Sequence, residues 1–111
     1  MAADQNNETA QYLLGYFYYQ GVGVEEDYDK AFLWMSKAAK AGDSDAERQF
    51  GSFYYLGIGT ECDFETAHRW YCKAADHGNE EAQYNVAVDY YFGLGVEQDW
   101  DEALRWYRIS A

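Results

Sequence analysis

The sequence predicts an all-α solenoid built from three copies of a helix–loop–helix unit. Two observations predict this class: the chain repeats itself every 36 residues, and its 111 residues include no proline. When residues 10–39, 46–75 and 82–111 are aligned, 10 of the 30 columns are identical in all three copies. A period of this length is typical of stacked repeats, in which each copy buries its apolar face on its neighbours.

A capping residue, an apolar face and a terminal glycine predict the first helix of each copy. In the first copy, Ala10, Leu14 and Tyr18 lie on one face, because their spacing of four residues matches the helical turn. The N-cap side chain accepts a hydrogen bond from an unpaired backbone N–H, and the glycine suits a left-handed cap. These caps and glycines recur as Asn7, Asp43 and Asn79, and as Gly21, Gly57 and Gly93.

The second helix of each copy follows a short loop and a second capping residue. Its N-caps are Asp27, Asp63 and Asp99. We expect it to bury Ala31, Trp34 and Ala38, with their equivalents Ala67, Trp70 and Ala74, and to stop at Gly42 and Gly78. Helices of about 13 to 15 residues are only marginally stable alone in water, so each must bury its apolar face on neighbouring helices. We therefore expect one domain of six antiparallel helices over residues 7–111, with repeats 7–42, 43–78 and 79–111, after a polar tail at 1–6.

These shared columns resemble a known family of repeats. The three copies read AQYLLGYFYYQGVGVEEDYDKAFLWMSKAAKAG, AERQFGSFYYLGIGTECDFETAHRWYCKAADHG and AQYNVAVDYYFGLGVEQDWDEALRWYRISA. They resemble the Sel1-like repeat family, a relative of the tetratricopeptide repeat. The resemblance implies a right-handed superhelix, a non-catalytic role, and a concave groove lined by the first helices, in which peptides or partner segments bind.

Composition and charge restrict the class of partner. Twenty acidic residues against eight basic ones give a formal charge of -12. This charge disfavours nucleic acid and anionic membranes and favours proteins with a basic surface. The start, MAADQNNETA, has neither the basic nor the apolar segment of a signal peptide, and no stretch is apolar and long enough to span a bilayer. We therefore expect a cytoplasmic protein.

A stripe on the first helices, next to their core-facing side, is a candidate partner-binding groove. It varies between copies and is rich in tyrosine and phenylalanine, which anchor interfaces at low entropic cost. The alternative is that Tyr19, Tyr55 and Tyr91, identical in all copies, belong partly to the core. The candidate groove residues are Tyr12, Tyr16, Tyr19, Arg48, Ser52, Tyr55, Tyr84, Val88, Tyr91 and Phe92.

The loops inside each copy carry more acids than helix capping needs. Stacking should align them into an acidic edge that meets a basic partner or loosely binds Ca²⁺. The alternative is that acids at helix starts only complement the helix macrodipole. The edge consists of Glu25, Glu26, Asp29, Glu61, Glu65, Glu97, Asp101 and Glu102.

No motif predicts catalysis, a cofactor or a metal centre. The glycine pairs follow a helix rather than a strand, so they do not indicate a nucleotide loop. His68 and Cys72 lie four residues apart and could form half a zinc site. However, Cys72 shares a column with Ser36 and Arg108, which we expect to be exposed, and His68 shares a tolerant, part-buried column with Phe32 and Leu104. We interpret both residues as incidental.

Two further expectations concern the cysteines and the last copy. Cys62 and Cys72 should lie roughly 14 Å apart along a helix, too far for a disulfide. Asp89 replaces Phe17 and Phe53, and we expect it to be exposed as part of a solvating cap.

The sequence therefore predicts a protein-interaction scaffold that acts through the groove and the acidic edge. The alternative is a small acidic inhibitor, such as an immunity or antitoxin-like protein or a phage-encoded blocker, of a basic enzyme that binds nucleic acid. A homodimer could also form through apolar residues of the last helix, namely Leu104, Trp106, Tyr107 and Ile109.

Overall fold

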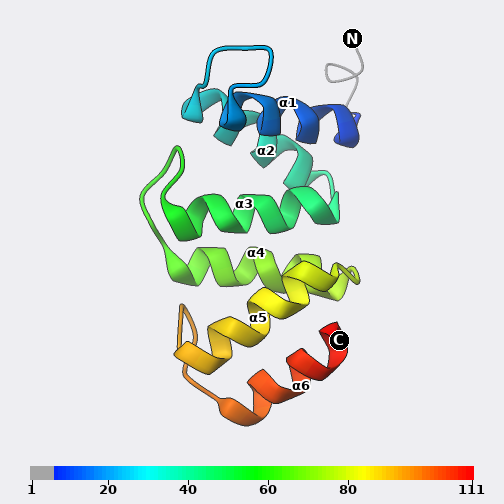
Figure 1. Cartoon of the computed structure of the whole chain (residues 1–111), viewed down its shortest axis with the longest axis vertical. Coiled ribbons are helices and arrows are strands. Elements are labelled where there is room, and N and C mark those ends of the chain that lie inside the picture. Colours follow the sequence, from blue (N-terminus) through cyan, green and yellow to red (C-terminus); the bar gives the residue numbers. More distant parts are fainter. Residues whose placement is uncertain (1–6) are drawn as a thin grey trace.

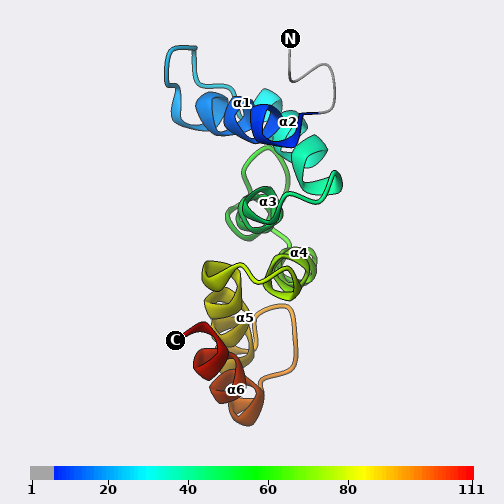
Figure 2. The same cartoon turned by 90° about the vertical axis from the view of Figure 1, so that its right-hand side faces the viewer.

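A computed structural model describes residues 7–111, and this part of the chain folds into six helices and no strands. The predicted tail at 1–6 lies outside the described residues. The helices are α1 (Glu8–Gln20), α2 (Tyr28–Lys40), α3 (Ser44–Leu56), α4 (Phe64–Asp76), α5 (Glu80–Phe92) and α6 (Trp100–Ser110). They stack as three antiparallel pairs along the long axis of a 45 × 25 × 19 Å molecule (Figures 1 and 2). The prediction of an all-α solenoid is confirmed.

The predicted caps begin and end the helices. Asn7 and Asp27, the N-caps of the first pair, accept hydrogen bonds from the backbone N–H groups of Ala10 and Lys30 at 2.9 and 3.1 Å. Their equivalents in the later copies cap in the same way. The first helix of each pair ends at a left-handed glycine, Gly21, Gly57 or Gly93, with φ between 71° and 75°. The same cap chemistry therefore fixes each turn.

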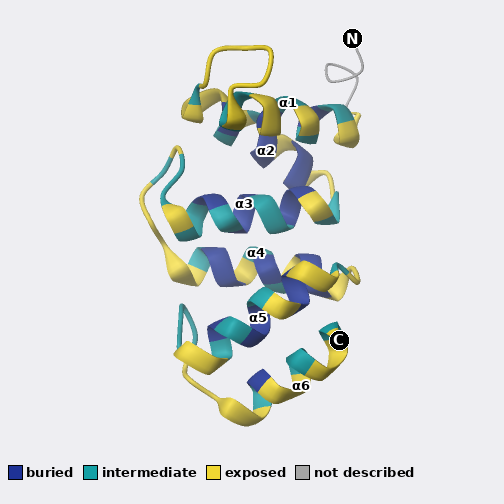
Figure 3. Cartoon of the chain, in the orientation of Figure 1, coloured by how far each residue is buried: buried dark blue, intermediate teal, exposed yellow. Residues whose placement is uncertain are grey.

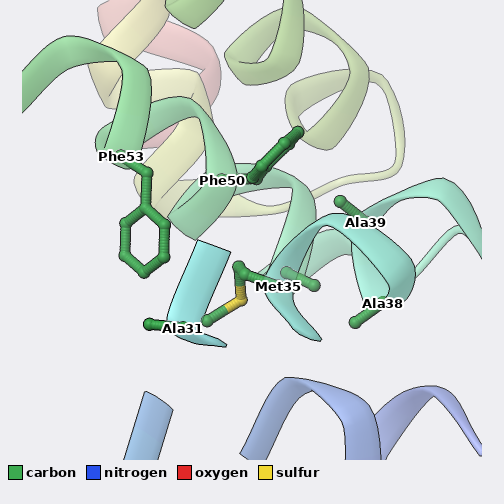
Figure 4. Packing of buried hydrophobic residues seen from close by; sticks show 7 residues of the cluster. Ala31, Met35, Ala38, Ala39, Phe50 and Phe53 are labelled. Atoms are coloured by element: carbon green, nitrogen blue, oxygen red, sulfur yellow. The ribbon is translucent and has the colours of Figure 1, made fainter. Parts of the chain in front are cut away.

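The core forms where the second helix of one pair meets the first helix of the next. Between α2 and α3, Met35 is fully buried beside Ala31, with Phe50 and Phe53 on the facing helix (Figure 4). Phe50 meets the ring of Trp70 edge-on at 5.1 Å, which joins this cluster to α4. A second cluster between α4 and α5 contains Ala67, Tyr71, Ala74, Ala75, Ala82 and Val86. The small alanines let the helix backbones approach closely.

The tryptophans of the second helices pack less deeply than expected. The alanines at 31, 38, 67 and 74 are buried as predicted, whereas Trp34 and Trp70 are only half-buried. Lys37 and Lys73 each place the ammonium 4.9 Å from the centre of these two rings. A lysine over the ring face is attracted by the aromatic quadrupole and leaves that face partly hydrated.

The prediction that Asp89 is exposed in a solvating cap is wrong. Asp89 is 2 % exposed, because position 89 faces the preceding pair through α4 rather than the end of the stack. Its carboxylate is paired with the buried ring of His68 at 2.7 Å. The terminal helices α1 and α6 instead have the fewest buried residues, namely Gln11 and Gly15 in α1 and Ala103 in α6 (Figure 3).

Candidate protein-interaction surface

An open hollow of about 510 Å³ lies between α3 and α5, the first helices of the second and third pairs, with Ser110 of α6 at its border. Three of the predicted groove residues line it: Arg48 and Ser52 from α3 and Tyr84 from α5. The remaining lining residues, which the sequence analysis did not select, are Glu80, Glu81, Asn85 and Ser110. The hollow therefore combines a cation, carboxylates, an amide, hydroxyls and an aromatic ring within one site.

Arg48 occupies the inner part of this hollow. Its side chain is 17 % exposed, and its Nη1 lies 3.5 Å from the carboxylate of Glu81, which is 78 % exposed. Tyr12, from the first pair, interacts electrostatically with Arg48. Burial raises the pKa of Tyr12, and the positive charge of Arg48 acts in the opposite direction. A guanidinium in this position offers several N–H donors to a carboxylate or carbonyl of a bound segment.

The other groove residues divide into exposed and half-buried groups. Tyr16 is exposed and stacks on Tyr12 with ring centres 6.3 Å apart, and Phe92 is also exposed. Val88 is half-buried. Tyr19 and Tyr55 are half-buried as well, with ring centres 5.2 Å from Phe53 and 5.0 Å from Phe64, respectively.

Tyr91, at the end of α5, belongs to a second hollow at the C-terminal end of the stack. This hollow has a volume of about 250 Å³ and is lined by Tyr91, Trp100, Ala103, Leu104 and Tyr107. Of the residues expected to support a homodimer, Leu104 and Ile109 are exposed. The other two, Trp106 and Tyr107, are half-buried.

The acidic loops lie on one side of the stack, but the prediction that all edge acids belong to loops is wrong, since helix first turns contain four of them, namely Asp29, Glu65, Asp101 and Glu102. The loops that join α1 to α2, α3 to α4 and α5 to α6 share the left edge of the view in Figure 1. Seven of the eight predicted edge residues are exposed, and Glu102 is half-buried, accepting a hydrogen bond from Arg105 Nε at 2.6 Å. Glu65 pairs with Arg69 at 3.8 Å between two well-exposed side chains. Six of the eight acids therefore have no ion pair within residues 7–111.

A polar cluster that was not predicted from the sequence lies between α4 and α5. His68 is 8 % exposed, Nδ1 lies 2.7 Å from Asp89 Oδ2, and Nε2 lies 3.4 Å from Cys72 Sγ. The expectation that the column of Ser36, Cys72 and Arg108 is exposed holds for Arg108 but is wrong for the other two, because Ser36 is buried and Cys72 is half-buried against the second core cluster. His68 and Cys72 are not incidental neighbours, since the helical spacing of four places Cys72 Sγ beside the ring of His68, whose other nitrogen contacts Asp89.

The ionisation of this cluster follows from burial and pairing. Burial alone would lower the pKa of His68, but the hydrogen bonds to Asp89 and Cys72, together with their charges, raise it to about 9. Burial also raises the pKa of Asp89, while the bond to His68 opposes that shift. At neutral pH, His68 is therefore an imidazolium paired with a carboxylate.

Comparison with known proteins decides the family. The family model described as "Sel1 repeat" matches residues 9–43, 44–79 and 80–111. The chain belongs to the Sel1 repeat family. Proteins of this family generally act in protein–protein interactions and are typically non-catalytic scaffolds. A comparison with curated proteins gave no match.

Solved structures of Sel1 repeat proteins have the same architecture. A Sel1 repeat protein from Oxalobacter formigenes is 37 % identical with a TM-score of 0.91, and the match covers 98 % of this chain and 43 % of that one. A protective antigen present in uropathogenic Escherichia coli strains is 38 % identical with a TM-score of 0.93, and the match covers 98 % and 23 %. The chain thus spans less than half the length of either protein.

A third structure shows the fold alone. Cysteine-rich protein B of Helicobacter pylori is 22 % identical with a TM-score of 0.77, over 98 % of this chain and 83 % of that one. In this Sel1 repeat chain, no described helix has the length and apolar character needed to cross a membrane.

Proposed function

We propose that this Sel1 repeat chain is a non-catalytic scaffold that binds a segment of a partner protein in the groove formed by α1, α3 and α5. The observation that carries the proposal is the hollow between α3 and α5, where Arg48, Ser52 and Asn85 present polar groups beside the exposed ring of Tyr84. Aromatic and arginine side chains in a concave surface are the groups that dominate the binding energy of protein interfaces.

The geometry favours an extended segment over a small rigid ligand. The hollow is open, and Arg48 in its lining interacts electrostatically with Tyr12, whose ring stacks on exposed Tyr16. Backbone carbonyls of an extended segment can accept from the guanidinium of Arg48, while an apolar side chain packs on Tyr84. The acidic loop edge then adds long-range attraction for a basic partner, which raises the association rate.

Peptide selection followed by groove substitutions tests this function. Peptides are selected from a displayed random library on the wild-type chain, and their affinities are measured by fluorescence anisotropy. Tyr84→Ala and Arg48→Gln should each weaken binding about tenfold or more, as expected for central interface residues. The control is Leu33→Ala, because Leu33 is 50 % exposed on α2 and lies outside the hollow. Equal affinities of the groove variants and the control, with helicity unchanged in all, would place the partner elsewhere.

The exposed acids on one side of the stack favour a second candidate, an acidic inhibitor of a basic enzyme that binds nucleic acid. Such a complex depends mainly on charge, so its affinity should fall steeply as salt rises. A segment held in the groove by apolar and hydrogen-bonded contacts should respond weakly to salt. Measuring affinity for a physiological partner across NaCl concentrations therefore separates the two functions.

A further inference from the structure

Three side chains form a continuous polar connection at the interface of α4 and α5. Asp89 Oδ2 lies 2.7 Å from His68 Nδ1, and His68 Nε2 lies 3.4 Å from Cys72 Sγ, one turn further along α4. Because an ionised carboxylate only accepts hydrogen bonds, Nδ1 carries a proton. Nε2 faces Cys72 Sγ, so the protonated ring of His68 places a positive charge beside the sulfur.

Stacking of the repeats does not require this polar pair, because the preceding interface is built without it. Positions 32 and 53 correspond to positions 68 and 89 through the 36-residue period, and both are phenylalanine. Phe53 is 1 % exposed and belongs to the apolar cluster between α2 and α3. Burying a histidine and an aspartate costs desolvation that an apolar pair avoids. The second interface therefore carries a titratable pair, beside a thiol, that the fold alone does not explain.

We propose that Cys72 is a site of covalent thiol modification, activated by His68 and oriented by Asp89, and that its reagents are low-molecular-weight disulfides. The Cys72 thiolate attacks one sulfur of the disulfide, the S–S bond of the reagent breaks, and a mixed disulfide forms at Sγ. The other half of the reagent leaves as a thiolate and takes up a proton from water. The disulfide is itself the oxidant, and a free thiol reverses the reaction by the same exchange.

Two other uses of a Cys–His–Asp arrangement fit these surroundings less well. Acyl transfer needs N–H donors beside the nucleophile to hold the oxyanion, but Cys72 lies within α4, where backbone N–H groups bond to carbonyls of the preceding turn. A metal centre needs at least three suitable ligands, and residues 7–111 contain no group of three that could hold an ion. Exchange with a disulfide needs only the thiolate and access to it.

The second cysteine of the chain is an internal reference of opposite character. Cys62 is exposed on the loop before α4, whereas Cys72 is partly buried. The Cys62 thiol donates to the backbone carbonyl of Tyr55 at 3.1 Å, and its neighbours in the sequence, Glu61 and Asp63, are acidic. If accessibility governed reactivity, Cys62 would react faster. Activation by His68 predicts the opposite order.

Several titratable groups surround Cys72 and affect how its rate of reaction depends on pH. His68 is the cation in direct contact, and Asp89 on α5 holds that cation in place. Tyr90 on α5 interacts electrostatically with Cys72 and also with Glu102 and Arg105 on α6. From α3, Tyr54 and Tyr55 pack against the same core cluster.

Single-cysteine proteins test the order of reactivity. Cys62→Ser leaves only Cys72, and Cys72→Ser leaves only Cys62. Each full-length variant is mixed with dithiodipyridine at pH 6 and pH 7.5, and the release of thiopyridone gives the second-order rate constant. We expect Cys72 to react about tenfold faster than Cys62 at pH 6, because the imidazolium of His68 lies 3.4 Å from Sγ and a thiol beside a positive charge is the stronger nucleophile. A Cys72 rate equal to or below that of Cys62 would overturn the proposal.

Variants of the pair separate activation from access. In the Cys62→Ser background, His68→Phe combined with Asp89→Phe restores the residues of the first interface. It should reduce the Cys72 rate at pH 6 about tenfold while circular dichroism stays helical. Asp89→Asn, which keeps the shape of the side chain, should lower the rate in the same direction and serves if the double variant does not fold. Unchanged rates in the folded variants would show that His68 does not activate the thiol.

Mass spectrometry after incubation with oxidised glutathione should locate the mixed disulfide on Cys72, and its absence there would contradict the assignment of the reagent class.

Discussion

Tyr71 shows how one buried side chain links stability to pH. It is 5 % exposed, and its hydroxyl lies 3.0 Å from Ser52 Oγ, the two groups sharing one hydrogen bond between α4 and α3. Burial raises the pKa of Tyr71 from 10.0 to about 12. In the unfolded chain the phenol ionises near its ordinary pKa, whereas the buried phenol stays neutral to a higher pH. Between the two pKa values, ionisation favours the unfolded state, so the free energy of unfolding decreases as pH rises.

We therefore predict an alkaline loss of stability that depends on Tyr71. The raised folded pKa means that this contribution is complete below pH 10 and is lost as pH rises from about 10 to about 12. At pH 11 the free energy of unfolding should be about 1 kcal/mol lower than at pH 9 from this residue alone. Urea unfolding at the two pH values measures it. Tyr71→Phe should show a smaller decrease by that amount, and an equal decrease in both proteins would exclude Tyr71 as the cause.

At the scale of single residues, the sequence predicted what the copies share and failed where one copy departs from the others. Asn7 and Gly21 were predictable because each position has one backbone task, and the same residue type recurs at it. The pairing of Asp89 with His68 was not predicted, because each residue was compared only with the same position in the other copies. Neither was compared with the position that it packs against in the neighbouring helix. The available signal was the joint change of Phe32 and Phe53 into a histidine and an aspartate across one interface. Opposite charges that appear together in two interlocking columns predict a buried pair.

At the scale of elements, the second glycine of the loop between α3 and α4 permits the close approach of the second pair to the first. Gly23 and Gly59 both have left-handed backbones, with φ of 72° and 71°. A Cβ on Gly59 would lie 2.7 Å from Phe32 Cβ and 2.7 Å from the carbonyl oxygen of Tyr28, both on α2. A Cβ on Gly23 would meet nothing within 4 Å among the described residues. The loop between α1 and α2 therefore has space around its second glycine, whereas the equivalent loop between α3 and α4 packs closely against α2.

This pair of glycines gives a matched prediction. Gly23→Ala should cost about 1 kcal/mol, because only the left-handed backbone is penalised. Gly59→Ala should cost about 2–4 kcal/mol, since overpacking against α2 adds to the same penalty. Urea unfolding of both variants measures the difference. Equal losses would mean that the loop between α3 and α4 moves away from α2 at little cost, and that the close approach does not hold the first two pairs together.

Which residues line the groove depends more on how the helices pack together than on the types of the individual residues. The sequence placed Arg48, Ser52 and Tyr84 on one face of their helices, and the structure brings these three to one hollow. It did not select Asn85 or Ser110, because Asn85 follows Tyr84 on a neighbouring face and Ser110 comes from the end of α6. Helical periodicity assigns residues to faces, whereas the contribution of α6 depends on how the third pair folds back on α5.

At the scale of the whole molecule, the distribution of charge works against the compactness of the stack. A formal charge of -12 is spread over a molecule 45 Å long, and the inter-helix loops place their surplus acids on one side (Figure 1). Like charges held near one another destabilise the folded chain through mutual repulsion. The repulsion acts between repeats, since each loop belongs to a different pair, and the binding of a basic partner or a rise in salt relieves it.

Salt should therefore stabilise the folded chain, and the acidic loops should account for much of the effect. Raising NaCl from about 0.01 M to about 0.1 M shortens the screening length from roughly 30 Å to 10 Å, so repulsion between loops is weakened. We expect a gain of about 1 kcal/mol, seen in thermal unfolding as a Tm higher by roughly 4 °C. Replacing one exposed acid in each loop, as in Glu25→Gln with Glu61→Gln and Glu97→Gln, should raise Tm at low salt and reduce its dependence on NaCl. If the triple variant keeps the full salt dependence, the repulsion originates in acids of the helices, and the loop edge contributes nothing to the balance of charge within the stack.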